Sequence, residues 1–385
     1  MALRVAIIGC GDIAHAYVTL SRHFPSFEIV GCASRTPERA EHFAAQHKLL
    51  TLNVDDALAG KHGIEAILNL TPPNSHYAIS RAALENGLHV YTEKPLATSL
   101  DEGRKLLTCS QEKGLRLGGA PDTFLGAALQ CARDVIDNKT IGDVVFGQAN
   151  FISGGMEHRH PNPEFFFKTG GGPVFDIGPY YVTALVSLLG PVASVSAIGT
   201  IGRPIRSVST SGSPQRGSAI HVEVPTTVQA LLRFRAGAQI SMSLSWDSQP
   251  TALPHIDLHG TLGRAVLPDP DFFGGSLKII REDSTTPVAT EALPWGRINW
   301  PEQQPSLANY RGLGLADFAQ AIADDRPHRA SGEMAFHVLE VLTAISTSTR
   351  SYEMCRIGST CERPLPISNG ASHKVSFSGP ASFEL

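Results

Sequence analysis

The stretch LRVAIIGCGDIA, residues 3–14, decides the fold of the first half of the chain. Its first six residues form a short apolar run, which is typical of a strand buried on both faces. Gly9, Gly11 and Ala14 then form a GxGxxA pattern, and the next helical turns carry no glycine or proline. The first glycine permits a tight turn, the second lets a ligand approach the backbone, and the alanine lets the helix pack on the strand. The stretch predicts a βα turn whose helix N-terminus faces a pyrophosphate.

Contacts to a dinucleotide are therefore expected from this turn. The residues expected to make them are Gly9, Gly11, Asp12 and Ile13. The alternative is a tight βα turn with no ligand. The position of the pattern, directly after an N-terminal strand and at the start of a helix, favours the dinucleotide.

The end of the second predicted strand, residues 28–33, bears on the choice of cofactor. An acidic residue there would bind the ribose 2′-hydroxyl of NAD, but the chain has Ser34 and Arg35, with Arg39 one turn later. A small hydroxyl and guanidinium groups suit a 2′-phosphate, so the sequence favours NADP. Alternatively, Arg35 stacks on the adenine, which would allow either NADP or NAD.

Two more strands, residues 64–70 and 88–91, are predicted to end at the same edge of the sheet. The first leads into TPPNSH at 71–76, and the second leads into Glu93-Lys94-Pro95. Ligands bind at the carboxyl ends of the strands in open α/β sheets. Further cofactor contacts are therefore expected here from Thr71, Pro72, Asn74, His76, Glu93 and Lys94. For His76 a purely structural role is equally consistent with its place in the first turn of a helix.

Composition limits the remaining possibilities. The 385 residues are 42% hydrophobic and 18% charged, with a formal net charge of −4 and the two signs interspersed. Two domains are expected from the length, and no footprint for nucleic acid or an anionic membrane is present. The six cysteines are scattered and show no metal-binding spacing, which indicates free thiols and a cytoplasmic protein.

Taken together, GxGxxA at 9–14, TPPNSH at 71–76, EKP at 93–95 and GGGPVFDIGPYY at 170–181 resemble the Gfo/Idh/MocA oxidoreductases. This is the glucose-fructose oxidoreductase and inositol dehydrogenase family, and the chain resembles its GPYY-type branch. The resemblance implies an α/β fold, with an N-terminal Rossmann parallel sheet and a C-terminal α+β domain that has a large, mainly antiparallel sheet. It implies a Rossmann domain over residues 1–122 and a substrate-binding and oligomerisation domain over 123–366. Beyond these, the Ser/Gly-rich end of the chain predicts a loosely ordered tail over 367–385.

The resemblance also assigns roles in the site. The lysine of EKP maps to Lys94, the implied proton-transfer residue, and the aspartate of the second block maps to Asp176. The histidine of that block falls on Tyr180 and its later aspartate on Thr183, which are two departures from the family pattern. Lys94, Asp176 and Tyr180 are the expected catalytic residues, and the last two are also expected to bind substrate. A lysine that acts as a base at neutral pH needs a lowered pKa, which burial would provide.

In the second half, the apolar residues of 227–235 and 238–246 alternate around a turn at Gly237, which predicts a hairpin with one packed face. The other face would suit the partner in a homodimer or homotetramer. Between them and the first domain lies a Gly/Pro-rich loop, 153–172, with aromatic and polar side chains suited to a sugar ring. His160 is expected to contact substrate, and a metal site with His158 is not expected because no third ligand is near in sequence.

The predicted function is hydride transfer between NAD(P) and a secondary hydroxyl or keto group of a sugar, sugar derivative or polyol, with no metal. Two alternatives stay open at this stage. One is a redox-assisted glycosidase or lyase with tightly bound cofactor, which oxidises a hydroxyl only transiently. The other is a non-enzymatic NADP-sensing regulator, against which the retention of Lys94 and Asp176 argues.

Overall fold

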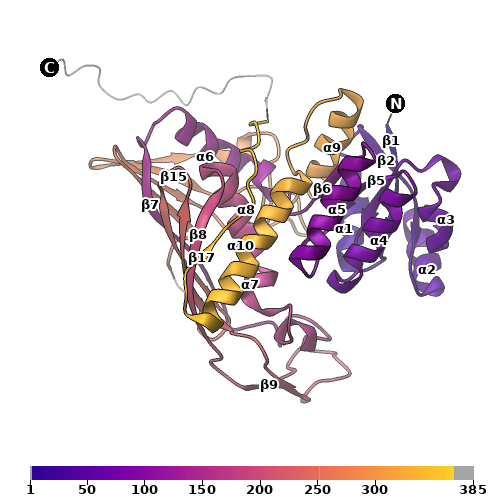
Figure 1. The fold of residues 1–385 in the computed structure, drawn as a ribbon, viewed down its shortest axis with the longest axis horizontal. Coiled ribbons are helices and arrows are strands. Elements are labelled where there is room, and N and C mark those ends of the chain that lie inside the picture. The colour runs from indigo at the N-terminus through magenta and orange to yellow at the C-terminus, as the bar shows by residue number, and fades with distance from the viewer. Residues whose placement is uncertain (1, 251, 368–385) are drawn as a thin grey trace.

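The first domain is a parallel sheet with helices on its faces, as predicted (Figure 1). A computed structural model describes residues 2–250 and 252–367. Within this part of the chain, six strands pair in the order β3-β2-β1-β4-β5-β6, every pair parallel. They are β1 (Leu3–Ile8), β2 (Phe27–Ala33), β3 (Leu50–Leu52), β4 (Ala66–Asn69), β5 (His89–Thr92) and β6 (Leu117–Gly119). The reversal of strand order next to β1 places the carboxyl ends of β1, β4 and β5 together, where ligands bind in such sheets.

The helices of this domain begin where the sequence chemistry allows. They are α1 (Asp12–Ser21), α2 (Pro37–His47), α3 (Val54–Leu58), α4 (Pro73–Glu85) and α5 (Leu100–Glu112). The hydroxyl of Ser99 accepts from the backbone N–H of Glu102 and caps α5. The side chain of Thr36, which precedes α2, makes no such bond. Pro37 at the first position of α2 has no N–H to satisfy, and the N–H of Arg39 bonds to the backbone carbonyl of Thr36 at 3.1 Å.

The second domain holds a nine-stranded sheet in the described residues, ordered β16-β15-β14-β13-β7-β12-β11-β8-β17. Only β12 and β7 pair in parallel, so the sheet is mainly antiparallel. Its strands are β7 (Val144–Ile152), β8 (Val192–Thr200), β11 (Thr227–Phe234), β12 (Gln239–Ser245), β13 (Ile256–Gly260), β14 (Arg264–Leu267), β15 (Leu277–Arg281), β16 (Ser284–Val288) and β17 (Cys355–Arg356). A separate pair, β9 (Ile205–Ser207) and β10 (Ala219–His221), lies beside it.

The predicted hairpin is β11–β12, with Gly237 at a φ of 106° in its turn. One face of the sheet is buried under α8 (Gly178–Leu189) and α10 (Gly332–Ser351), and the other is exposed. The remaining helices of this half are α6 (Ala127–Asp137), α7 (Gly172–Asp176) and α9 (Leu313–Ala323). The alternation of buried and exposed residues along β11 is the period of two that the sequence showed.

Helix α10 lies between the large sheet and the first domain (Figure 1). It packs on β8 and α8 on one side and on α5 on the other, while α9 packs on β2 and β6. The segment 313–351 therefore joins the two halves rather than belonging only to the second. Of the predicted tail, 367–385, only Ile367 is described, and its N–H donates to the side chain of Gln130 at 2.8 Å. The rest lies outside the described residues.

The start of α9 depends on a carboxylate from another part of the chain. Its N-terminal residue is preceded by Gly312, which has no side chain to act as a cap. Asp122, buried after β6, accepts from the N–H groups of Gly312 at 3.0 Å and Gly314 at 2.8 Å. These two bonds satisfy N–H groups that a helix terminus leaves without partners. Asp122 thus fixes the first segment that returns to the Rossmann domain.

Replacement of Asp122 tests this arrangement. Asp122→Ala leaves two buried N–H groups without an acceptor, so we expect the free energy of unfolding to fall by about 2–4 kcal/mol in urea. Asp122→Asn keeps an acceptor oxygen and should cost less than half as much. Asp101→Ala, an exposed residue of α5, is the matched surface control, with an expected change within about 0.5 kcal/mol. Equal losses for Asp122→Ala and Asp122→Asn would contradict the capping role.

Candidate active site at the domain boundary

A cleft of about 310 Å³ opens where the carboxyl ends of β1, β4 and β5 face α7 and α8. Both halves of the chain contribute to it. The Rossmann side provides Ile13, Leu70, Thr71, Pro73, His76, Glu93, Lys94 and Pro95, and the other side provides Phe165, Phe166, Gly170, Gly171, Phe175, Asp176 and Tyr180. The three expected catalytic residues therefore share one cavity with several of the expected cofactor contacts.

The glycine turn has the geometry that a pyrophosphate needs. Gly9 has a φ of 111°, and a Cβ there would lie 2.5 Å from the carbonyl carbon of Leu70, so glycine is required by the fold itself. A Cβ on Gly11 would meet nothing within 4 Å. The protein gives no packing reason for glycine at position 11, and the open space beside it at the start of α1 fits an approaching phosphate. The residues present thus fit a dinucleotide.

A second cavity, of about 460 Å³, lies on the other side of this turn. It is lined by Cys10, Gly11, Asp12, His15, Glu38, Arg39, His42 and Phe43. Arg39 thus borders it, whereas Arg35 and Ser34 do not. The Ser34 hydroxyl instead accepts from the N–H of Thr36 at 3.3 Å. Glu38, an acidic residue at this cavity, lies in the first turn of α2 and not at the end of β2, where an acidic ligand of the NAD ribose is expected.

The TPPNSH turn is organised by Asn69, the last residue of β4. Its side-chain oxygen accepts from the N–H and hydroxyl of Thr71 at 3.2 and 2.7 Å, and its amide donates to the carbonyl of His76 and to Ser80. Asn69 is fully buried. A polar residue inside the apolar run IEAILNL was a visible signal for this role, since buried polar groups need partners.

His76 ties this turn to the EKP segment. Its Nδ1 lies 2.7 Å from the carbonyl oxygen of Pro95 and its Nε2 lies 2.7 Å from that of Thr71. Burial lowers the pKa of the imidazole, and the two carbonyls act in the opposite direction. Because both ring nitrogens face backbone oxygens, His76 holds the walls of the cleft in place, and neither nitrogen is available to a ligand. Asn74 is exposed and is not among the residues that line the cleft.

Glu93 also acts within the protein. Its Oε1 accepts from the hydroxyl of Tyr17 at 3.2 Å, and its Oε2 accepts from the backbone N–H of Lys94 at 2.9 Å. Tyr17, on α1, is fully buried. This chain of contacts connects the helix of the glycine turn with the backbone of the lysine. No sequence signal pointed to Tyr17.

Lys94 crosses the domain boundary to reach Asp176. Its Nζ donates to the backbone carbonyl of Asp176 at 2.6 Å and to the carboxylate at 3.0 Å. The two side chains retain 17% and 18% of their exposure, so the pair is largely removed from water yet open to the cleft. The two residues, both expected to be catalytic, are thus in direct contact.

The charge state of Lys94 differs from the expectation. Burial by itself lowers the pKa of Lys94, but Asp176, Tyr180 and Glu93 raise it, and the pKa ends above its ordinary value. The carboxylates outweigh desolvation because one lies at hydrogen-bond distance and the other in the adjacent residue. The surrounding charges therefore favour the ammonium form of Lys94 in this arrangement.

Tyr180 lies against this ammonium. Nζ of Lys94 is 5.1 Å from the centre of its ring, and the guanidinium carbon of Arg311 is 6.0 Å from the same centre. The phenol accepts from Nη2 of Arg311 at 3.4 Å, and the same Nη2 donates to Asp271 at 2.8 Å. Burial raises the pKa of Tyr180, so the phenol keeps its proton. Arg311 and Asp271 are far apart in sequence, and only the fold brings them to Tyr180.

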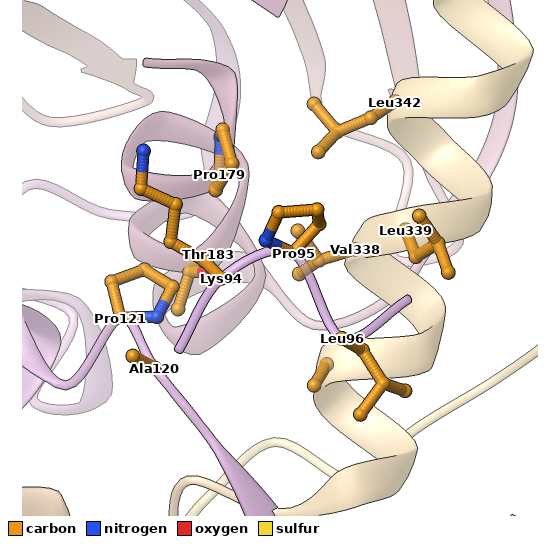
Figure 2. Close-up of a pocket in the computed structure, with 11 residues that line it drawn as sticks. Lys94, Pro95, Leu96, Ala120, Pro121, Pro179, Thr183, Val338, Leu339 and Leu342 are labelled. Carbon is orange, nitrogen blue, oxygen red and sulfur yellow. The ribbon is translucent and has the colours of Figure 1, made fainter. Parts of the chain in front are cut away.

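Thr183, which holds the place of the second family aspartate, lies behind Lys94. Figure 2 shows it with Pro179 on one side of the Lys94–Pro95 segment and Val338, Leu339 and Leu342 of α10 on the other. The space left between these side chains is only about 10 Å³, room for a single water molecule at most. Thr183 therefore packs behind the lysine and does not border the main cleft.

The aromatic loop forms the roof of the cleft. Phe165 and Phe166 line it, their ring centres 4.0 Å apart, and the ring of His160 contacts both edge-on at 5.2 and 5.5 Å. His160 itself is not among the lining residues and sits behind the phenylalanines. Its Nδ1 lies 2.8 Å from the carbonyl oxygen of Asn162, within the loop. The predicted loop thus borders the cleft through these two rings, and His160 contacts the rings without lining the cleft itself.

A buried arginine anchors this loop. The side chain of Arg206 is fully buried and pairs with Glu157 and Asp247, and its guanidinium stacks on Phe167 at 5.1 Å. Arg206 thereby connects β9 to this loop and to Asp247, which follows β12.

No group of three or more His, Cys, Asp or Glu suited to a metal occurs among the residues described. None of the helices in this part of the chain is long and apolar enough to span a bilayer.

Both halves of the chain match one family of known proteins. Residues 3–119 match the oxidoreductase family with an NAD-binding Rossmann fold, GFO_IDH_MocA, and residues 129–266 match the GFO/IDH/MocA C-terminal domain. These are dehydrogenases and reductases that use NAD(P). The chain belongs to the Gfo/Idh/MocA oxidoreductase family and is an NAD(P)-dependent enzyme acting on CH–OH groups.

Individual relatives agree with this assignment. The chain is 29% identical over 251 residues to dTDP-3,4-didehydro-2,6-dideoxy-alpha-D-glucose 3-reductase of Streptomyces violaceoruber, covering 64% of this chain and 69% of that one. It is 27% identical over 291 residues to trans-1,2-dihydrobenzene-1,2-diol dehydrogenase of Sus scrofa, covering 75% and 81%. The solved complex of levoglucosan dehydrogenase with NADH has the same fold, with a TM-score of 0.77 at 22% identity over 93% of this chain and 100% of that one.

Proposed function

We propose that this protein transfers a hydride reversibly between NADP(H) and a secondary hydroxyl or keto group of a sugar, sugar derivative or polyol. The observation that carries the proposal is the ammonium of Lys94, held by Asp176 beside Tyr180 in a cleft next to the glycine turn. The names of the deoxysugar reductase and of levoglucosan dehydrogenase support a sugar as the substrate class.

In the proposed reaction, Lys94, Asp176 and Tyr180 have different roles. The nicotinamide supplies or accepts the hydride. Lys94 holds the proton that a carbonyl oxygen needs when it becomes a hydroxyl, and Asp176 fixes the direction of that ammonium through two acceptors. The neutral phenol of Tyr180 offers a second donor at the same wall of the cleft. Because Lys94 is already protonated, the arrangement as it stands serves reduction.

Phe165 and Phe166 support a cyclic substrate. Their stacked rings form an apolar surface on the side of the cleft that the second half of the chain provides, and Phe165 is 50% exposed. The C–H face of a sugar ring packs on such a surface, while its hydroxyl rim turns to the polar residues. We propose that the two phenylalanines hold the ring and that His160 supports them from behind.

A panel assay with two lysine variants tests the reaction. NADPH or NADH oxidation is followed with keto-sugars, and NADP or NAD reduction with sugars, polyols, anhydro-sugars and cyclic diols. Lys94→Met should lower kcat about 10²–10⁴-fold, because a positioned proton donor is lost, and leave the Kd of the cofactor within a few-fold. Lys105→Met, on the exposed face of α5, is the matched control and should leave kcat unchanged.

The pH dependence gives a second readout of the same assay. Since the pKa of Lys94 is raised, its ammonium persists through neutral pH. Reduction should be insensitive to pH between about 7 and 8, and oxidation should accelerate as pH rises, because it needs the neutral amine. Full activity of Lys94→Met would refute the proposal. Glycoside cleavage without net cofactor turnover would favour the redox-assisted lyase instead.

The preference for NADP is also a proposal. Arg39 supports it as the arginine that borders the cavity beside the glycine turn, with His15 and His42 adjacent. Glu38 and Asp12 border the same cavity, and a carboxylate there would suit the free ribose hydroxyls of NAD. Arg35 is exposed and outside the lining, so Arg39 takes the larger share of the proposed contact.

Titration of both cofactors separates these roles. Arg39→Gln should weaken NADP binding about tenfold or more, the loss of one charge-assisted bond, and change NAD binding little. Arg35→Gln should have a smaller effect on NADP. The measurement is the Kd of each oxidised cofactor by calorimetry. Unchanged NADP affinity in both variants would show that neither arginine reads the 2′-phosphate.

We further propose a homodimer or homotetramer formed through the outer face of the large sheet. Phe146, Leu231 and Ile198 lie on one face, as the pairing of β7, β12, β11 and β8 requires, and are 49%, 50% and 59% exposed. Helices cover the opposite face of this sheet. Exposed apolar side chains gathered on one face are typical of an interface.

One substitution on that face tests the assembly. Leu231→Glu places a charge at its centre and should shift the species seen in analytical ultracentrifugation to monomer. Leu50→Glu introduces the same change at a leucine of β3 that is 46% exposed, and should leave the assembly intact. A wild-type protein that sediments as a monomer would exclude the proposal.

We also propose that the protein is located in the cytoplasm. All six cysteines are free thiols, and Cys10 borders the cavity beside the glycine turn. Free thiols of this kind persist in a reducing compartment.

A further inference from the structure

Arg311 is a largely buried arginine whose guanidinium contacts the hydroxyl of Tyr180. Its side chain is only 13% exposed and comes from the segment before α9. It is fixed at three points, since Nη2 donates to Asp271 and to Tyr180, and Nη1 lies 3.4 Å from the side-chain oxygen of Asn309. An arginine so constrained presents its donors in one geometry.

The chemistry of the contact sets the direction of the tyrosine hydrogen. A guanidinium carries only donors, so in the bond at 3.4 Å the phenol oxygen of Tyr180 must be the acceptor. Its own hydrogen is then free to be donated elsewhere. Within the described part of the chain, this oxygen makes no other hydrogen bond, and Tyr180 lines the cleft beside Lys94. The hydrogen is therefore available to an acceptor in the cleft.

We propose that Arg311, held by Asp271, is a positioning residue that turns Tyr180 into a hydrogen-bond donor toward the oxygen of the substrate, alongside Lys94. The proposal rests on the function proposed above and specifies a residue pair for it. The two cations also flank the tyrosine ring, at 5.1 Å for Lys94 and 6.0 Å for Arg311. Any negative charge that develops on the phenol oxygen as it donates is stabilised by both.

Asp271 adds a pH-sensitive element to this pair. Burial raises its pKa to about 6, Arg311 and Lys94 lower it, and Asp269 and Asp176 raise it. Protonation of Asp271 below that pH removes the charge that holds Arg311, whereas the anion above it restores the bond. The orientation of Tyr180 should therefore weaken as the pH falls through about 6.

A double-mutant cycle separates positioning from a merely structural role. Arg311→Met should lower kcat about 10²-fold, because a misplaced donor loses its near-attack geometry, with the Kd of the cofactor unchanged. In the Tyr180→Phe background the same substitution should change kcat less than about threefold, since no hydroxyl remains to orient. Arg311→Lys should recover part of the loss. Equal losses in both backgrounds would overturn the proposal.

A spectroscopic measurement decides the question without turnover. The protein is labelled with 3-fluorotyrosine, and the ¹⁹F signal of residue 180 is assigned by its absence in Tyr180→Phe. In wild type this signal should shift with a midpoint near pH 6, as Asp271 titrates. The shift should vanish in Asp271→Asn and in Arg311→Met. A shift that persists in Arg311→Met would refute transmission through the arginine.

The two experiments also distinguish failure of this proposal from failure of the proposed function. If no substrate in the panel reacts, the ¹⁹F titration still decides whether Arg311 couples Asp271 to Tyr180. If Arg311→Met does not fold, as judged by cofactor binding, Arg311→Lys and Asp271→Asn replace it in both measurements. Loss of the pH-6 response together with intact kcat in Asp271→Asn would overturn the catalytic part of the proposal.

Discussion

The contact between Lys94 and Asp176 is the interaction on which the site depends. It joins the segment after β5 to the end of α7, so the cleft is built by both halves of the chain. Two charges withdrawn from water cost free energy unless they are paired and further hydrogen-bonded, and the carbonyl of Asp176 supplies that extra acceptor. The ammonium must therefore be placed accurately, and much of the surrounding structure does this. Glu93 holds the backbone of the lysine, His76 holds Pro95, and α10 closes the space behind.

The first half of the fold could be predicted because its signals are local. A strand, a glycine turn and a helix start are each encoded within a dozen residues, and the period of two revealed β11 and β12 in the same way. The strands after β12 were not predicted, since their pairing joins residues without a strong repeat. The cap of α9 by Asp122 could not be predicted either, because the two partners are separated by 190 residues. Such contacts exist only once the chain has returned to the first domain.

The site shows the same division. Lys94, Asp176 and the glycine turn, which the sequence singled out by residue type and position, border the cleft or the cavity beside it. His76 and Glu93 were predicted as cofactor contacts, yet both use their polar atoms within the protein. The positions of these residues in the sequence show only that polar groups occur at the edge of the sheet. They cannot show which of these groups already have hydrogen-bond partners within the protein. Arg311 and Asp271 lie 40 residues apart and were missed for the complementary reason, that partners meet only in three dimensions.

The replacement of the family histidine by Tyr180 changes whether the side chain at this position can exchange a proton near neutral pH. An imidazole can exchange a proton near neutral pH, but a buried phenol with a raised pKa cannot lose one on its own. A tyrosine at this position can therefore only donate a hydrogen bond to a developing oxyanion, and this bond is strongest when cations lie beside the phenol. The chain provides two, Lys94 and Arg311, and balances each with a carboxylate, Asp176 and Asp271. At position 180, where the chain departs from the family pattern, two residues distant in sequence thus place a second ion pair beside the phenol.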